Sequence, residues 1–175
     1  MPKISVLRPL AEAELSILDH GRMNAAEASE FDFHGFKTAH GKRAAFAENG
    51  LLAEDGGTLA VVDGGDEAVG TVSWRRATTG TVSFTWNIGI SLRTSARGKG
   101  LGTAAQRALA DYLFDYTRAN RVEAHTETEN IAEQRALEKA GFTREGVVRG
   151  AAFRAGRWRD MVAYSVLRTE YQPGG

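Results

Sequence analysis

The chain contains no cysteine, which excludes disulfide bonds, a thiol nucleophile and thiolate-bound metals. It has only three prolines, and no apolar run reaches the roughly 18 residues that a membrane-spanning helix requires. Its first residues, MPKIS, include no long apolar segment of the kind found in secretory signal peptides. These absences favour a cytoplasmic protein without a membrane partner.

Net charge is also absent, because 22 basic residues balance 22 acidic ones, and nucleic acid is therefore not expected as a partner. Apolar residues make up 42% of the 175 positions, as is ordinary for a globular chain. This length favours one domain over residues 1–175. The C-terminal arginines are expected to be mostly solvated strand residues, and the alternative is that some line a substrate cleft: Arg144, Arg149, Arg154, Arg157 and Arg159.

Alternating turn signals and periodic apolar segments predict a mixed α/β order. The turn at 64–66 indicates a hairpin between its flanking strands. Residues 22–56 are less clear, with a helical turn at 25–30 and a helix within 37–52. Elsewhere we expect strands at 4–7, 58–63, 68–76, 81–92, 121–126, 142–149 and 158–167, and helices at 11–19, 101–116 and 131–140.

The segment RGKGLGT separates an apolar strand from the helix at 101–116. Its glycines allow positive φ and a close approach of the backbone to a ligand. Backbone N–H groups at the start of a helix, together with two basic side chains, favour a phosphate or pyrophosphate. The predicted anion site consists of Arg97, Gly98, Lys99, Gly100, Leu101, Gly102 and Thr103.

Two other interpretations of this segment exist. It is compatible with a plain strand-to-helix turn. It also approaches a dinucleotide fingerprint, with Glu123 about twenty residues further on as a ribose-binding acid. A doubly wound domain would need several more strand–helix units, whereas about seventy residues with one helix and a closing hairpin remain. The dinucleotide alternative is therefore disfavoured.

Three motifs in order resemble the GCN5-related N-acetyltransferase (GNAT) superfamily, in particular its RimJ/RimL-type branch of ribosomal-protein N-terminal acetyltransferases. They are NIGISL at 87–92, RGKGLG at 97–102 and ENIAEQRALEKAGF at 129–142. The segment GRWRD at 156–160 is also similar to this branch. The resemblance covers residues 58–168 well and the first fifty residues poorly.

The resemblance implies a GNAT fold of the α/β class. Its central sheet is mixed and mostly antiparallel, with about six or seven strands, helices on both faces and a V-shaped cleft between the fourth and fifth strands. Residues 1–57 would form the acceptor side, and residues 58–168 the acetyl-CoA-binding core. Acetyl-CoA is the implied co-substrate, and no metal is expected.

The family pattern also implies where the cofactor lies. The pantetheine arm would pair with the main chain at Ile90, Ser91 and Leu92, and the pyrophosphate would contact residues 98–103. Asn130 would bind the pantetheine, although it is equally suited to capping the helix that follows. Arg135 is a candidate for the phosphates, with a solvated helix arginine as the alternative.

The resemblance implies direct acetyl transfer to a primary amine. His125 lies where relatives in the protein N-terminal branch can carry a catalytic glutamate on the fifth strand, and its ordinary pKa near neutrality suits proton acceptance. Glu127 is the second candidate for the base, and Glu123 shares the strand face. For the acid, Leu137 occupies the family's tyrosine position, and Glu133 occupies the serine position of this branch. Glu133 is therefore a candidate, with a surface role or protonation by water as alternatives.

The acceptor pocket is expected in the N-terminal part. Within FDFHGF at 31–36, Asp32 and Phe33 are candidates for an acceptor rim, although alternating phenylalanines more often belong to a core. The predicted acceptor is a protein N-terminus or a small amine such as an aminoglycoside, an amino acid or a polyamine. A monomer or homodimer is expected, and the alternative function is a catalytically silent acyl-CoA-binding module. The three tryptophans are expected in the core: Trp74, Trp86 and Trp158.

Overall fold

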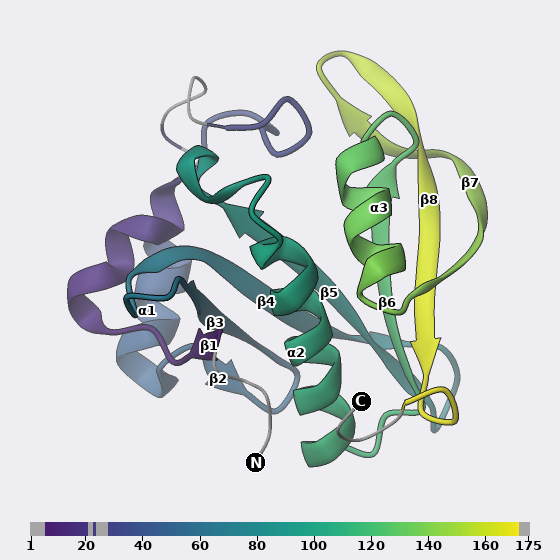
Figure 1. The fold of residues 1–175 in the computed structure, drawn as a ribbon, viewed down its shortest axis with the longest axis horizontal. Helices are drawn as coiled ribbons and strands as arrows, with labels where there is room; N and C mark the ends of the chain where they lie inside the picture. Colours follow the sequence, from purple (N-terminus) through teal and green to yellow (C-terminus); the bar gives the residue numbers. More distant parts are fainter. Residues whose placement is uncertain (1–5, 21–22, 24–27, 172–175) are drawn as a thin grey trace.

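In the computed structural model, which describes residues 6–20, 23 and 28–171, a central sheet separates two layers of helices (Figure 1). The sheet order is β1-β3-β4-β5-β6-β8-β7, with β2 paired to β3. Every pair is antiparallel except β5 with β6. The strands are β1 (Leu7–Arg8), β2 (Leu52–Ala53), β3 (Gly56–Val62), β4 (Ala68–Thr78), β5 (Phe84–Leu92), β6 (Arg121–Glu127), β7 (Thr143–Arg154) and β8 (Arg157–Leu167).

The helices occupy both faces of the sheet, as predicted. The 3₁₀ helix η1 and helix α1 lie behind the sheet in Figure 1, and α2 and α3 lie in front. None of the helices in the described ranges is long and apolar enough to cross a membrane. Their bounds are η1 (Glu12–Asp19), α1 (His40–Asn49), the 3₁₀ turn η2 (Thr94–Ala96), α2 (Leu101–Tyr116) and α3 (Ile131–Lys139).

Each face of the sheet has its own apolar core. In front, the α2 residues Ala105, Leu109 and Leu113 are fully buried, because their helical spacing places them on one side of the helix. Behind, Ile17 and Leu18 of η1 pack with sheet residues in a separate, smaller cluster. Both faces of the sheet are thus packed against helices, and this packing fixes the positions of the strand ends that line the candidate site.

β5 and β6 form the one parallel pair, and they soon part. Only Trp86–Val122 and Asn87–Glu123 are in register. Beyond Asn87, β5 continues to pair with β4 as far as Leu92, while β6 continues to pair with β8. Within the described chain, the backbone of residues 88–92 therefore has no strand on its β6 side. This opening is the V-shaped cleft that the family resemblance predicts, between the strands numbered fourth and fifth there.

Several local predictions need correction. The sheet has eight strands rather than six or seven, because the two-residue β2 adds to β3. The predicted helix at 11–19 is a 3₁₀ helix, stabilised by Glu14, which accepts hydrogen bonds from Arg8 and from the Ala11 N–H. The helix expected within 37–52 spans only 40–49, because the chain turns to positive φ at Gly50 and Leu51.

The other strand predictions differ mainly in length. β5 starts at Phe84 rather than at 81, and β7 continues to Arg154 rather than ending at 149. The predicted strand at 4–7 and turn at 25–30 lie partly outside the described residues. Trp74 and Trp86 are buried as predicted, whereas Trp158 is 69% exposed, because it stands on the projecting β7–β8 hairpin against Phe153.

Candidate functional site

The glycine-rich segment connects η2 to the start of α2, where a helix presents free N–H groups. Gly98 and Gly100 have φ values of +72° and +79°, which glycine adopts without strain. No atom lies within 4 Å of a Cβ built at either glycine, so the backbone there is open. Gly100 is the N-cap of α2 and offers no side chain to the first-turn N–H groups. The loop therefore fits an anionic ligand at the positive end of α2.

Arg97 precedes these glycines and joins the cleft to the N-terminal part of the chain. Its Nε donates a 3.0 Å hydrogen bond to the Leu92 carbonyl, which closes the end of β5. Its Nη2 is buried and has no hydrogen-bond partner among the described residues, although Asp32 Oδ2 lies 3.6 Å away. A buried guanidinium nitrogen that lacks an acceptor is suited to an anion in the neighbouring loop.

Asn130 and Arg135, the two α3-side candidates for binding the cofactor, differ in their surroundings. Asn130 is the N-cap of α3, and its Oδ1 accepts a 3.3 Å hydrogen bond from the Glu133 N–H. This capping accounts for Asn130 structurally and leaves its Nδ2 available to a ligand. Arg135 is exposed on α3, and its contact with the phosphates stays a prediction.

Glu133 lies half-buried near the start of α3, where that helix faces the first turns of α2. Burial, together with the negative charge of Asp32, raises the pKa of its carboxyl to about 7. A hydrogen bond with the buried amide of Gln106 on α2 opposes this rise. Gln106 is itself oriented by a 3.2 Å hydrogen bond to the Gly102 carbonyl. The arrangement gives Glu133 a carboxyl that is partly protonated near neutral pH.

His125 lies on β6 two residues beyond Glu123, the last β6 residue paired with β5. Arg75 Nε donates to Asn87 Oδ1 at 3.3 Å, which turns the Asn87 amide nitrogen toward His125. The distance from that nitrogen to His125 Nδ1 is 3.2 Å. His125 Nδ1 is therefore the acceptor, and the neutral ring carries its proton on Nε2. The ring is exposed at the point where the two strands part.

The other two candidate carboxylates are held in ion pairs. Glu127 binds Arg154 through both oxygens, at 2.5 and 2.8 Å, and the two side chains are only 5% and 8% exposed. This hydrogen bonding lowers the pKa of Glu127, so its carboxylate is ionised and fully engaged. Glu123 lies 3.3 Å from Arg121. This pairing favours a structural role for Glu127, whose role as a second base stays a prediction. Arg154, expected to be solvated, is buried as its partner.

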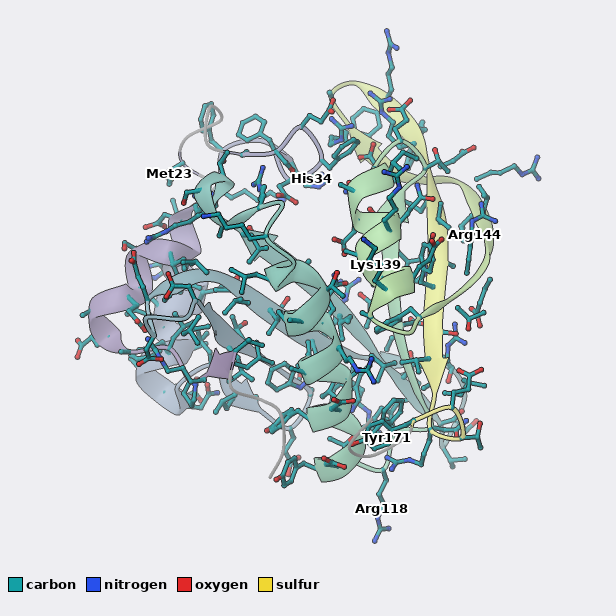
Figure 2. All side chains as sticks on the ribbon, in the orientation of Figure 1. Met23, His34, Arg118, Lys139, Arg144 and Tyr171 are labelled. Atoms are coloured by element: carbon teal, nitrogen blue, oxygen red, sulfur yellow. The ribbon has the colours of Figure 1, made fainter. Side chains whose placement is uncertain are left out.

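The segment at 28–36 crosses the mouth of the cleft. On one side Asp32 approaches Arg97, and on the other the Arg154 guanidinium lies 5.4 Å from the centre of the Phe31 ring. Figure 2 shows His34 projecting from this segment near α3. Phe33 packs against Phe36 in an edge-to-face contact at 5.3 Å, and neither ring joins the two cores. The favoured interpretation of these phenylalanines as core residues is therefore wrong for Phe33 and Phe36, and a role of the segment at the acceptor rim stays a prediction.

Two adjoining cavities lie on the face of the sheet that η1 and α1 cover. The smaller, of about 270 Å³, is lined by Asp32 and by Ile90 and Ser91 at the open end of β5. The larger, of about 450 Å³, lies between α1 and strands β3 to β5. Both are lined by Lys42, Ser73 and Gly89, so they form one groove. The structure thus brings Asp32 together with the main chain predicted to hold the pantetheine, whereas Phe33 lines neither cavity.

Three side chains of the site have no signal in the sequence. Asn87 and Arg75 orient His125 from two other strands, and Gln106 contacts Glu133 from α2. Each contact joins segments at least 12 residues apart. Only the strand pairing and the packing of α2 against α3 bring them together.

The model of the acetyltransferase (GNAT) domain family matches residues 5–143, which is most of the chain. The parted strands, the glycine loop at the start of α2 and this match agree, and the chain belongs to the GNAT acetyltransferase family. The predicted fold and family are thereby confirmed.

Relatives with known names extend this assignment. "Probable N-acetyltransferase YjcK" of Bacillus subtilis is 34% identical over 105 residues, which cover 60% of this chain and 58% of that protein. YdaF of the same organism, named as a candidate ribosomal N-acetyltransferase, is 34% identical over 85 residues. These residues cover 49% of this chain and 46% of YdaF. The chain thus spans about half the length of the curated relatives it matches. YdaF is consistent with the predicted RimJ/RimL-type branch.

Solved structures share the fold. The spermidine N-acetyltransferase of Vibrio cholerae, in complex with CoA and spermine, superposes with a TM-score of 0.77 at 19% identity. The superposition covers 94% of this chain and 96% of that one. At this identity the likeness establishes the architecture, and the acceptor must be argued from this chain's own residues.

Proposed function

We propose that this protein transfers the acetyl group of acetyl-CoA directly to a primary amine. The observation that carries the proposal is the parting of β5 from β6 beside an open glycine loop at the start of α2. An extended arm can pair with the free edge of β5 as an additional strand would. The chain has no cysteine that could carry the acetyl group as a thioester, which favours direct transfer.

Acetyl-CoA would be held mainly by main-chain groups. The edge at Ile90, Ser91 and Leu92 would pair with the pantetheine arm. Residues 98–103 would receive the pyrophosphate, with positive charge from Arg97 and Lys99. Asn130 would use its free Nδ2, and Arg135 would reach the phosphates from α3. Acetyl-CoA supplies the acetyl group as a thioester, whose carbonyl carbon accepts the amine nitrogen while its bond to sulfur breaks.

His125 is the proposed base. An amine entering at the point where β5 and β6 part replaces the Asn87 amide as donor to His125 Nδ1. The ring then accepts the amine proton at Nδ1, while Nε2 keeps its own proton. Its exposure permits proton exchange with water, so that the neutral ring is restored after each turnover.

Glu133 is the proposed acid. Its protonated carboxyl donates a proton to the departing sulfur, which leaves as a thiol. A pKa of about 7 suits this step, because the group is partly protonated at neutral pH and its proton is readily given up. Asp32 supports the step by raising that pKa, so its contribution is to hold the proton on Glu133.

The acceptor would enter between the 28–36 segment and the sheet, with Asp32 and Phe33 at the rim. A protein N-terminus and a small-molecule amine both fit an open groove of this kind. Initial rates with acetyl-CoA and the amine varied separately test the proposal. Intersecting double-reciprocal lines are expected for direct transfer. Parallel lines would instead indicate an acetylated protein intermediate, and binding of acetyl-CoA without turnover on any amine would indicate a silent binding module.

A further inference from the structure

Four glycines lie within strands β3 to β5, and the fold itself requires glycine at three of them: Gly56, Gly57 and Gly70. A Cβ built at any of these three would lie 2.4 Å from an atom of the neighbouring strand. Gly89 of β5 differs, because a Cβ there would make only an ordinary contact of 3.5 Å with the Ser73 hydroxyl. Its φ also lies outside the positive range that favours glycine. The packing of the sheet therefore does not require a glycine at position 89.

Gly89 faces the groove. Ile88 belongs to the core under α2, and Leu92 packs against that core. Because successive strand residues point to opposite faces, Gly89 and Ser91 face the other way, where both line the groove. Glycine inside a strand often marks a place where a ligand comes close. The absent side chain leaves room for a ligand on the groove floor, beside Asn87 and close to the proposed base.

The larger cavity extends from this point toward α1, which lies behind the sheet in Figure 1. Its lining is mainly apolar and neutral, with aliphatic groups from Ala45 of α1, Leu51 and Ala53. No aspartate or glutamate of the described chain lines it. An ammonium group placed there would lose hydration without gaining a counter-charge, which is unfavourable. The volume of about 450 Å³ falls in the range of pockets that hold small organic ligands.

We infer that the acceptor is a primary monoamine with an uncharged, mainly apolar body, and that this body occupies the larger cavity. The inference rests on the proposed function and names its substrate class. The reacting amine lies over Gly89, next to the contact between Asn87 and His125. Asp32 is the single carboxylate among the described lining residues, and Arg97 already shares its charge, so the groove offers a polycation no further counter-charge. Gly89 determines specificity, because a side chain there would obstruct the path of the body into the larger cavity.

Matched amines test the body and the charge separately. Initial rates compare hexylamine with ethylamine, which lacks the body, and with 1,6-diaminohexane, which adds a second charge to the same chain. 2-Phenylethylamine and spermidine extend the comparisons to a ring and to a polyamine. We expect hexylamine or 2-phenylethylamine to exceed both ethylamine and the polycations about tenfold or more in kcat/KM, a difference that burial of about two methylene groups accounts for. Preference for 1,6-diaminohexane or spermidine, or equal values with ethylamine, would overturn the inference and leave the acetyltransferase proposal intact.

Two substitutions locate the body of the acceptor. Ala45→Leu narrows the larger cavity from α1, and Ala44→Leu, the same change at the neighbouring exposed position outside the lining, is the matched control. Gly89→Val places a branched side chain on the groove floor without backbone strain. Ala45→Leu and Gly89→Val should each lower the kcat/KM ratio of the preferred amine to ethylamine about tenfold, and Ala44→Leu should leave it unchanged. An unchanged ratio in either folded variant would contradict the inference.

Calorimetry separates this inference from the transfer proposal, because it requires no turnover. The same amines are titrated into the protein loaded with CoA. If hexylamine or 2-phenylethylamine binds more tightly than ethylamine and Ala45→Leu removes the difference, the cavity holds the body even where no acetyl group is transferred. Equal binding of these three amines, or binding of none of them, would overturn the inference.

Discussion

Replacing Glu133 by glutamine should make the protein more stable and less active at the same pH. The folded carboxyl has a pKa of about 7 against an ordinary value of 4.5. Between these values the folded state holds more protons than the unfolded state, so the free energy of unfolding falls as pH rises. At about 1.4 kcal/mol per pKa unit, the loss reaches about 3 kcal/mol above pH 7. Glu133→Gln removes this loss and keeps a hydrogen-bonding partner for Gln106.

Chemical denaturation at two pH values measures the effect. At pH 8 the midpoint of Glu133→Gln should exceed that of the parent, and near pH 4.5 the two should nearly coincide. Glu48→Gln, the same change on an exposed position of α1, is the control and should match the parent at both. Equal stability of the Glu133→Gln variant and the parent at pH 8 would refute the claim that burial raises the pKa of the Glu133 carboxyl.

Activity tests the second half of the reasoning. A general acid typically contributes about 10²–10⁴ in rate, so Glu133→Gln should lower kcat by about a hundredfold or more. The alkaline decline of kcat, expected near pH 7 in the parent, should disappear. In Asp32→Asn that decline should move to lower pH, because the loss of a nearby negative charge lowers the pKa of Glu133. If Glu133→Gln is more stable than the parent but has an unchanged kcat, Glu133 has a buried carboxyl with a raised pKa and is not the general acid.

Three further substitutions separate the other roles. His125→Ala should lower turnover by roughly a hundredfold and leave the calorimetric affinity for acetyl-CoA intact, and a change within about threefold would make the residue structural. Gly102→Glu should abolish acetyl-CoA binding, because the new carboxylate repels the pyrophosphate. The variant should still fold, since a Cβ at this position meets only ordinary contacts at 3.7 and 3.9 Å. Preserved acetyl-CoA binding, measured by calorimetry, would contradict the role of the loop as an anion site. Glu127→Ala should cost about 3–5 kcal/mol of stability in denaturation, because it leaves a buried guanidinium of β7 unpaired, whereas normal stability with lost turnover would return this residue to the reaction.

Local sequence patterns predicted those helices and hairpins whose own residues show a periodicity or a turn motif. The 3.6-residue apolar period predicted α2 over 101–116, the bounds that the structure has, and the glycine turn predicted the β3–β4 hairpin. Those features depend on residues within one turn or one hairpin. The N-terminal helices depend instead on distant partners. Asp19 of η1 accepts a hydrogen bond from Arg43 of α1, 24 residues further along the chain, and an apolar period does not reveal such a contact.

The candidate site divides in the same way. The glycine loop could be recognised from seven consecutive residues, and its open backbone agrees with that recognition. The environments of the titratable groups could not be predicted. Glu133 owes its pKa to burial between two helices and to Asp32, about a hundred residues earlier in the chain. Glu127 is held in an ion pair by Arg154, which lies 27 residues away on another strand of the sheet. Spacing along a chain fixes neither burial nor partners.

The central claim is that the protein moves an acetyl group from acetyl-CoA to an amine, and isotopic labelling of the acetyl group tests it most directly. The purified protein is incubated with labelled acetyl-CoA and the amine panel, and free thiol and labelled amide are measured in the same sample. The account predicts one labelled amide for each thiol released, with both products formed about a hundredfold or more slowly in Glu133→Gln. Thiol released without labelled amide, or acetyl-CoA bound with neither product formed, would contradict it.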